Sequence, residues 1–184
     1  YLVAAKLQDR AIDALVVQVG DPQKLGEDAS TARNRCAKQA VRIMAWDAFQ
    51  RDGPEQADVL VDALLGLATT GPARKPFAQA IDWLSAQQAP VIALDVPSGL
   101  HPDFGVAEGA AVHASHTVTF IAPKLGLAAE QGPDYSGEVS VAQLGAPDGF
   151  FDPFEEQGVD VIEPSALPPR SRAAHKGHFG HVLV

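Results

Sequence analysis

An apolar run that ends in a carboxylate, a proline, a hydroxyl and a glycine contains the first residues that could do chemistry. In this run Asp95 follows Val91–Leu94 and comes shortly before Ser98 and Gly99. Such runs are typical of strands that are buried on both faces in parallel sheets. Ligands bind beyond the carboxyl ends of these strands, so Asp95 is well placed to contact one. The segment also fits an aspartate that caps its own turn, because Asp and Ser before Gly are ordinary turn residues.

A second segment has the same plan as the first. Residues 59–66 form an apolar stretch with Asp62 near its carboxyl end and Gly66 shortly after. Two neighbouring strands would then present carboxylates at one edge. Because burying an unpartnered charge costs several kcal/mol, each carboxylate should meet a cation, a metal ion, a backbone N–H or a substrate hydroxyl. A shared site is the simplest interpretation.

Charged groups follow two further segments. Lys124 comes just after the predicted strand 116–121, where it could neutralise Asp95 or contact a ligand. A lysine that extends over the protein surface would look the same in the sequence.

The loop 66–76 combines glycines, hydroxyls and two cations ahead of a helix, a composition that can hold phosphate. A plain connecting loop is the alternative.

The elements that must position these residues alternate between helix and strand. Apolar periodicity predicts helices at 1–10, 27–49 and 77–84, strands at 14–19, 59–66, 91–95 and 116–121, and an edge strand at 137–142. Residues 100–114 have no sustained period and predict a loop, in which His101 and His113 are expected to be exposed rather than metal ligands. This alternation predicts an α/β fold.

Composition limits the classes of function. The 184 residues suffice for one sizeable domain, and no apolar run is long enough to span a membrane. With 14 Lys and Arg against 23 Asp and Glu, the net charge of -9 argues against a nucleic-acid partner. The single cysteine, Cys36, fits a packing role in a reducing compartment. We therefore expect a soluble cytoplasmic protein.

Four segments together resemble the NAD(P)H-hydrate (NAD(P)HX) epimerase domain, namely 61–66, 74–77, 94–99 and 119–126. The resemblance extends over nearly everything up to Gly145. Residues 171–184 resemble the opening of the ADP- or ATP-dependent NAD(P)H-hydrate dehydratase, which in bacteria often follows the epimerase in one chain. We therefore expect an epimerase domain at 1–145 without its N-terminal part, a linker at 146–170 and a truncated dehydratase domain at 171–184.

The resemblance implies both a fold and an activity. The fold would be a Rossmann-like three-layer α/β/α sandwich with a mostly parallel sheet. The epimerase would interconvert the R and S hydrates of NADH and NADPH, and the dehydratase would restore the cofactor from the S form. We expect a bacterial homo-oligomer that acts on the small molecules NADHX and NADPHX, with no membrane or nucleic-acid partner.

The resemblance also implies roles for single residues. Asp62 and Ser98 would bind a potassium ion through their oxygens. Asp95, helped by Lys124, would handle protons as the C6 hydroxyl leaves and returns or as the ring opens. The substrate would be held by Asp95 and by the loop residues Gly66, Leu67, Ala68, Thr69, Thr70, Gly71 and Pro72. The dehydratase domain would use ADP or ATP with magnesium.

The sequence departs from the family pattern in two places. The phosphate loop Asn-Asn-Gly-Gly-Asp, which also supplies a potassium ligand, is expected just ahead of Tyr1 and is absent. The loop 66–71 is longer than the Gly-Thr-Gly of most bacterial members. Two alternatives therefore stay open. One is an enzyme of another reaction class, because doubly wound sheets carry many chemistries. The other is a catalytically inactive binding or scaffolding module.

Overall fold

A computed structural model of the chain describes residues 1–53, 56–67, 71–145 and 147. The helices are α1 (Leu2–Gln8), the 3-10 helix η1 (Pro22–Lys24), α2 (Glu27–Lys38), α3 (Trp46–Asp52), α4 (Phe77–Ser85), α5 (Leu125–Ala128) and α6 (Gly132–Ser136). The strands are β1 (Leu15–Gln18), β2 (Arg42–Ala45), β3 (Leu60–Asp62), β4 (Val91–Leu94), β5 (His116–Phe120) and β6 (Glu138–Ala142). The predicted linker, apart from Pro147, and the predicted dehydratase segment lie outside the described residues.

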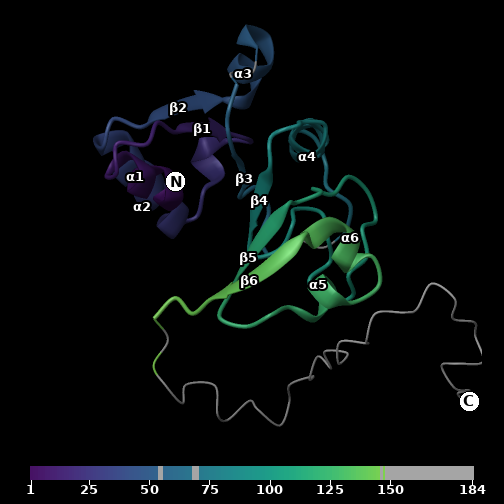
Figure 1. Cartoon of the computed structure of the whole chain (residues 1–184). Coiled ribbons are helices and arrows are strands. Elements are labelled where there is room, and N and C mark those ends of the chain that lie inside the picture. The colour runs from purple at the N-terminus through teal and green to yellow at the C-terminus, as the bar shows by residue number, and fades with distance from the viewer. Residues whose placement is uncertain (54–55, 68–70, 146, 148–184) are drawn as a thin grey trace, which may run out of the picture. The chain divides into compact units, whose positions relative to one another are not determined.

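Every pair of neighbouring strands in the described chain is parallel. One sheet contains β1 and β2, and a second has the order β3-β4-β5-β6 (Figure 1). Strand β6 forms an edge of the second sheet, as its alternating sequence predicts. The mostly parallel α/β fold expected from the sequence is confirmed.

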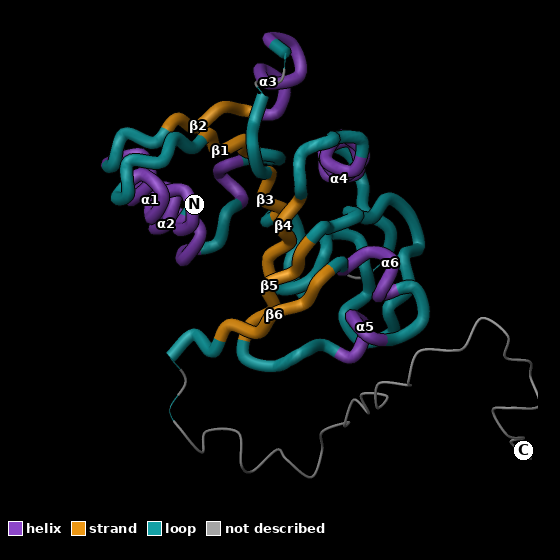
Figure 2. The backbone as a smooth tube through the Cα atoms, in the orientation of Figure 1, coloured by secondary structure: helices purple, strands orange, loops and turns teal. Residues whose placement is uncertain are grey.

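Helices α1 and α2 lie together on one side of the smaller sheet (Figure 2), and the core residues show that helices also pack against its other face. On one face, Ala4 of α1 and the fully buried Cys36 of α2 form a core with Val41, which adjoins Val16 and Ile43. On the other face, aromatic residues of α3 and α4 pack against Val17 and Met44 in a second core, whose buried members are Val19, Trp46, Phe49 and Ala80. The small sheet thus lies between two helical layers.

The larger sheet is covered unequally. Ile81 and Leu84 of α4 pack against Val91 on one face of the sheet. The strand register places Val61 beside Ile92, so these two side chains share the opposite face, where Val61 is exposed and Ile92 half-buried. Within the described residues, therefore, the apolar core of this sheet is concentrated on the α4 face.

One predicted element is wrong. The expected helix over 27–49 is divided into α2, β2 and α3. Ala40 has a φ of +58°, which ends the helical path, and β2 then pairs with β1 in register from Leu15–Arg42 to Gln18–Ala45. The sequence has no Gly or Pro at this point, and the helical spacing of its apolar residues concealed the short strand. Tertiary pairing therefore overrides the local helical signal.

The segment after β4 is folded more tightly than the predicted loop. An antiparallel bridge joins Leu100 to Ala107, and the Ser98 carbonyl accepts a hydrogen bond from the Val112 N–H at 2.9 Å. No helix among the described residues combines the length and apolar character that crossing a membrane would require.

Gly99 is the residue that permits this close packing. Its φ is +95°, a conformation that L-residues with side chains rarely adopt. A Cβ atom at this position would lie 2.1 Å from the Ala110 carbonyl oxygen. Neither the turn nor the backbone behind it has space for a side chain.

We expect Gly99→Ala to lower the free energy of unfolding by at least about 2 kcal/mol, because it adds a backbone clash to an unfavourable φ. Gly26→Ala is the control: a Cβ there meets nothing within 4 Å, so its cost should stay below about 1 kcal/mol. Urea unfolding measures both. Equal losses for the two variants would contradict this account of the turn.

Candidate functional site

Strands β4 and β5 end in the same unusual way. Asp95 follows β4 with a φ of +70°, and Ile121 follows β5 with a φ of +71°. Each is held by its neighbouring strand: the Asp95 N–H donates to the Val118 carbonyl and the Ile121 N–H to the Ala142 carbonyl, both at 2.8 Å. Left-handed backbone is uncommon outside glycine and tends to occur at functional sites. The left-handed backbone of Asp95 and Ile121 therefore indicates that this edge of the sheet is a candidate functional site.

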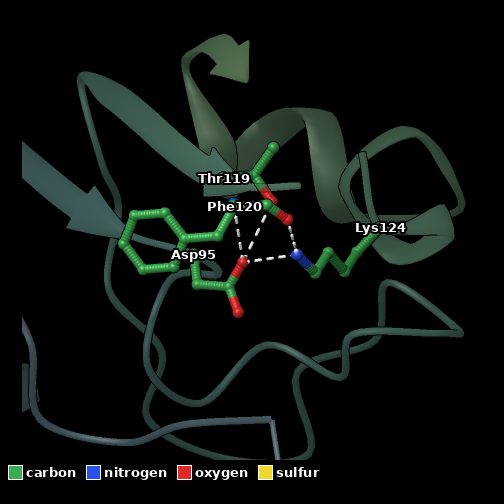
Figure 3. A network of polar contacts seen from close by, with 4 residues as sticks. All are labelled: Asp95, Thr119, Phe120 and Lys124. Carbon is green, nitrogen blue, oxygen red and sulfur yellow. Dashed lines mark hydrogen bonds and ion pairs between the residues drawn. The ribbon is translucent and has the colours of Figure 1, made fainter. Parts of the chain in front are cut away.

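The Asp95 carboxylate is held through one of its oxygens (Figure 3). Asp95 Oδ1 accepts hydrogen bonds from the Phe120 N–H at 3.0 Å, the Thr119 hydroxyl at 3.1 Å and Lys124 Nζ at 2.6 Å. Lys124 Nζ also donates to the Phe120 carbonyl at 2.6 Å. The described residues make no hydrogen bond to Oδ2, so this oxygen can accept one from a ligand.

These contacts determine the charge of Asp95. Partial burial raises the pKa of its carboxyl, but the hydrogen bond from Lys124 and then the Phe120 N–H, the Lys124 charge and the Thr119 hydroxyl outweigh it. The net result is a pKa below the ordinary 3.8. Asp95 is therefore ionised at neutral pH and can accept a proton or bind a donor.

The Asp62 carboxylate also accepts hydrogen bonds, mainly from polar groups of the turn after β4. Its Oδ2 accepts from the Ser98 N–H at 2.7 Å, and its Oδ1 from the Ser98 hydroxyl at 2.7 Å and the Leu64 N–H at 3.2 Å. Ser98 Oγ in turn accepts from the Leu65 N–H at 3.0 Å. Asp62 and Ser98, predicted to act together, do lie in contact.

The environment of Asp62 is nearly the opposite of that of Asp95. Only 1% of Asp62 is exposed, and burial raises its pKa above 3.8 against the opposing hydrogen bonds from Ser98 and Leu64. The described residues offer Asp62 no ion-pair partner. They also hold no group of three or more His, Cys, Asp or Glu arranged for a metal, so a cation beside Asp62 would need other oxygen ligands.

A pocket opens at the carboxyl ends of β3 and β4. Its lining includes Asp95, the turn 96–99 and residues 100–102. Of the predicted substrate loop, Gly66, Leu67 and Gly71 line the pocket, Pro72 is not among the lining residues, and Ala68, Thr69 and Thr70 lie outside the described residues. The structure thus brings part of the predicted binding loop to Asp95.

The predicted shared site needs one correction. Asp95 and Ser98 reach the pocket, whereas Asp62 is buried beneath Ser98 and does not line it. Lys124 does not line it either, and its ammonium group contacts Asp95 and the Phe120 carbonyl instead. This position favours an indirect role for Lys124, through the orientation and charge of Asp95.

Sequence reasoning missed three contributors to the site. Thr119 is fully buried on β5, and because that strand also contains His116 and Thr117, its hydroxyl gave no distinctive signal in the sequence. His101 and Glu108 line the pocket from the segment after β4. The expectation that His101 is an exposed loop residue is wrong: it is half-buried, and its ring contacts Phe104 with centroids 4.6 Å apart. No spacing rule identifies these last two.

Parallel strands with a pocket and an ionised aspartate at their carboxyl ends are the arrangement of a Rossmann-like α/β protein. Within this class, the family described as YjeF-related protein N-terminus matches residues 1–126, and the chain belongs to that family.

Named relatives agree with this assignment. The bifunctional NAD(P)H-hydrate repair enzyme Nnr of Coxiella burnetii is 37% identical over 195 positions, which span 100% of this chain and 38% of that protein. Its counterpart in Escherichia coli is 32% identical over 190 positions, covering 100% of this chain and 36% of that protein. The chain thus spans little more than a third of these relatives. The family resemblance predicted from the sequence is confirmed.

A solved structure supports the fold independently. The crystal structure of yeast ynu0 superposes with a TM-score of 0.69 at 19% identity, covering 89% of this chain and 67% of that one. At this identity the likeness shows the Rossmann-like fold and nothing about the chemistry.

The ion pair between Lys124 and Asp95 predicts a particular pH dependence. Asp95 has a lowered pKa in the folded state, so its contribution to stability is complete above the unfolded pKa and is lost as the pH falls through the folded pKa. Lys124→Met should raise the pKa of Asp95 and lower the free energy of unfolding at pH 7 by about 1–2 kcal/mol. The deficit should shrink at pH values below the pKa of Asp95.

Carboxyl carbon NMR titration and urea unfolding at several pH values measure these effects. Lys6→Met is the matched control, because the Lys6 side chain is 70% exposed and lies 3.9 Å from Asp9. A pH-independent stability loss in Lys124→Met would show that the lysine acts only by packing.

Proposed function

We propose that this chain is the epimerase part of a nicotinamide nucleotide repair enzyme and that it interconverts the R and S hydrates of NADH and NADPH. Family membership and the names of the curated relatives support the substrate class. The observation that carries the proposal is the Asp95 carboxylate: three donors fix Oδ1, no described residue bonds to Oδ2, and Asp95 lines a pocket.

The charge of Asp95 favours one of the two chemical routes. Loss of the C6 hydroxyl would require an acid to protonate it, and Asp95 is ionised at neutral pH because of its lowered pKa. Ring opening begins instead with removal of the hydroxyl proton: the C6 oxygen becomes a carbonyl as the bond from C6 to the ring nitrogen breaks. Attack of that nitrogen on the other face of the carbonyl closes the ring, and the proton returns to oxygen.

In this mechanism Asp95 Oδ2 accepts the hydroxyl proton and returns it after the ring closes. Thr119, Phe120 and Lys124 hold Oδ1, which fixes the direction in which Oδ2 points. Lys124 also stabilises the carboxylate form, which lowers the basicity of Asp95, so the contribution of this carboxylate would come from its placement rather than from its strength as a base. The segment 100–108, which lines the pocket through His101 and Glu108, would limit the access of water to the open-chain intermediate.

We further propose that a potassium ion binds beside Asp62 and Ser98. A buried carboxylate without an ion-pair partner among the described residues is stabilised by a nearby cation. Its carboxylate and hydroxyl oxygens are suitable ligands for a hard cation. The ion would supply positive charge to this part of the site. Ser98 donates a hydrogen bond to Asp62 and also lines the pocket, so it would connect the ion site with the pocket.

The rest of the protein is proposed from its relatives. Because those relatives are named as bifunctional repair enzymes, we propose that the whole protein also dehydrates the S hydrate with ADP or ATP and magnesium. We also propose that it is a cytoplasmic homo-oligomer in a bacterial cell.

The proton-transfer role is tested by Asp95→Asn in the intact protein. We expect the rate of epimerisation at saturating substrate to fall by about 100-fold or more, because a positioned base contributes at least this much. The affinity for the hydrate should change much less. Chromatographic separation of the R and S forms over time measures the rate.

Asp82→Asn, on the exposed side of α4, is the control and should retain the full rate. Full activity in Asp95→Asn would contradict its assignment as the base. If the unaltered protein binds no hydrate and catalyses no epimerisation, a binding or scaffolding module becomes the better interpretation.

The potassium proposal predicts a specific effect of the cation on stability. At constant ionic strength, replacing choline with potassium should raise the Tm, and Ser98→Ala should remove most of that increase. Ser85→Ala is the matched control: it loses a hydroxyl bonded to the Ala111 carbonyl at 3.2 Å, yet it should retain the potassium response. A Tm that is insensitive to potassium would exclude the site.

A further inference from the structure

Three polar side chains on the larger sheet form a cluster that the Asp95 site does not use. His116 is the first residue of β5, and Glu138 and Ser140 belong to β6. The strand register pairs His116 with Glu138, and the two-residue period of a strand places Ser140 on the same face. None of the three lines the pocket at Asp95. Any chemistry of this cluster is therefore separate from the proposed epimerase reaction.

The contacts within the cluster are those of a hydroxyl and a base. His116 Nε2 lies 2.8 Å from the Ser140 hydroxyl, which is hydrogen-bonding distance. On the other side of the ring, His116 Nδ1 lies 3.8 Å from Glu138 Oε2. When the hydroxyl donates to Nε2, the ring proton is on Nδ1 and faces the carboxylate. A serine, an imidazole and a carboxylate in this order can activate the serine for attack on a carbonyl carbon.

Glu138 contributes to this arrangement through its charge alone. The distance of 3.8 Å is longer than a hydrogen bond, and 85% of the Glu138 side chain is exposed. Water therefore screens its attraction for the imidazolium that forms when His116 takes a proton. The chemistry depends mainly on the contact between Ser140 and His116.

A ligand can reach the cluster from the sheet face opposite α4. The His116 side chain is 30% exposed, and Ser140 is half-buried. The register places Ile92 beside His116 and Val118 beside Ser140 on this face, and both apolar side chains are half-buried. An apolar acyl group can lie against them while its carbonyl carbon meets the Ser140 hydroxyl.

A backbone N–H next to Ser140 is not used by the sheet. The Glu138 N–H donates to the Ser115 carbonyl at 3.2 Å, and alternate residues of a parallel strand bond to the same neighbour. Val141 therefore directs its N–H away from β5, and β6 is an edge strand in the described chain. In α/β-hydrolases the N–H of the residue after the nucleophile stabilises the oxyanion, and Val141 occupies that position in the sequence.

We propose that Ser140 is a second reactive site, which takes the acyl group of activated esters with His116 as its base. The Ser140 oxygen forms a bond to the carbonyl carbon as its proton moves to His116 Nε2. The bond to the leaving alcohol oxygen breaks, and that oxygen takes the proton from His116. Water then attacks the acyl-serine with the same base, which releases the carboxylic acid and returns a proton to Ser140.

The surroundings limit the class of substrate. Val118 and Ile92 favour an apolar acyl chain, and the Glu138 carboxylate disfavours an anionic one. Because Glu138 assists His116 only weakly, the reaction requires a good leaving group, as in aryl esters. We therefore expect slow hydrolysis of aryl esters of short fatty acids, with p-nitrophenyl butyrate as the probe.

A fluorophosphonate reagent, which reacts with activated serines, tests the site directly. In the intact protein, peptide mass spectrometry should find the label on Ser140. His116→Gln should abolish it, because glutamine can keep a hydrogen bond to the hydroxyl but is not a base. Ser30→Ala is the matched control: it removes a half-buried hydroxyl bonded to the Leu25 carbonyl at 3.3 Å and should not change the labelling. A label that never reaches Ser140, or that persists in His116→Gln, would overturn the proposal.

Hydrolysis of p-nitrophenyl butyrate provides a second measurement. Ser140→Ala should lower kcat/KM about tenfold or more, because the nucleophile and its base then no longer act together. Glu138→Gln should lower kcat by at most about fivefold with KM unchanged, the effect of an exposed ion pair. The Tm of each variant checks that the fold is retained. An unchanged rate in Ser140→Ala at an unchanged Tm would identify the contact with His116 as purely structural.

Discussion

The position of one carboxylate oxygen depends on the register between two strands. Because β4 and β5 are parallel, and Leu94 pairs with Val118, the residue after β4 lies beside the last residues of β5. Asp95 adopts a left-handed backbone there, which brings Oδ1 to the Phe120 N–H and the Thr119 hydroxyl. A shift of one residue would present the other face of β5 and remove the Thr119 hydroxyl. Sheet pairing thus positions the proposed base.

The two aspartates show how one edge of a sheet can hold carboxylates of different character. Asp95 has the Lys124 ammonium group within 2.6 Å and a pKa below 3.8, whereas Asp62 is buried, has no cationic partner among the described residues and has a raised pKa. Environments that separate two pKa values in this way usually separate two roles. Proton transfer is therefore better assigned to Asp95. Asp62 organises the turn through Ser98 and is the group that a bound cation would stabilise.

Much of the site could be predicted because its key residues follow strands. The positions of Asp95 and Lys124 after apolar segments allowed a contact between them to be considered, since parallel strands end at the same edge, and the structure decides for that contact over a surface lysine. Thr119, His101 and Glu108 were not found, because their roles depend on register and on how residues 100–108 fold back. The strand β2 was hidden within an apparent helix, because four residues are too few to show a period of their own.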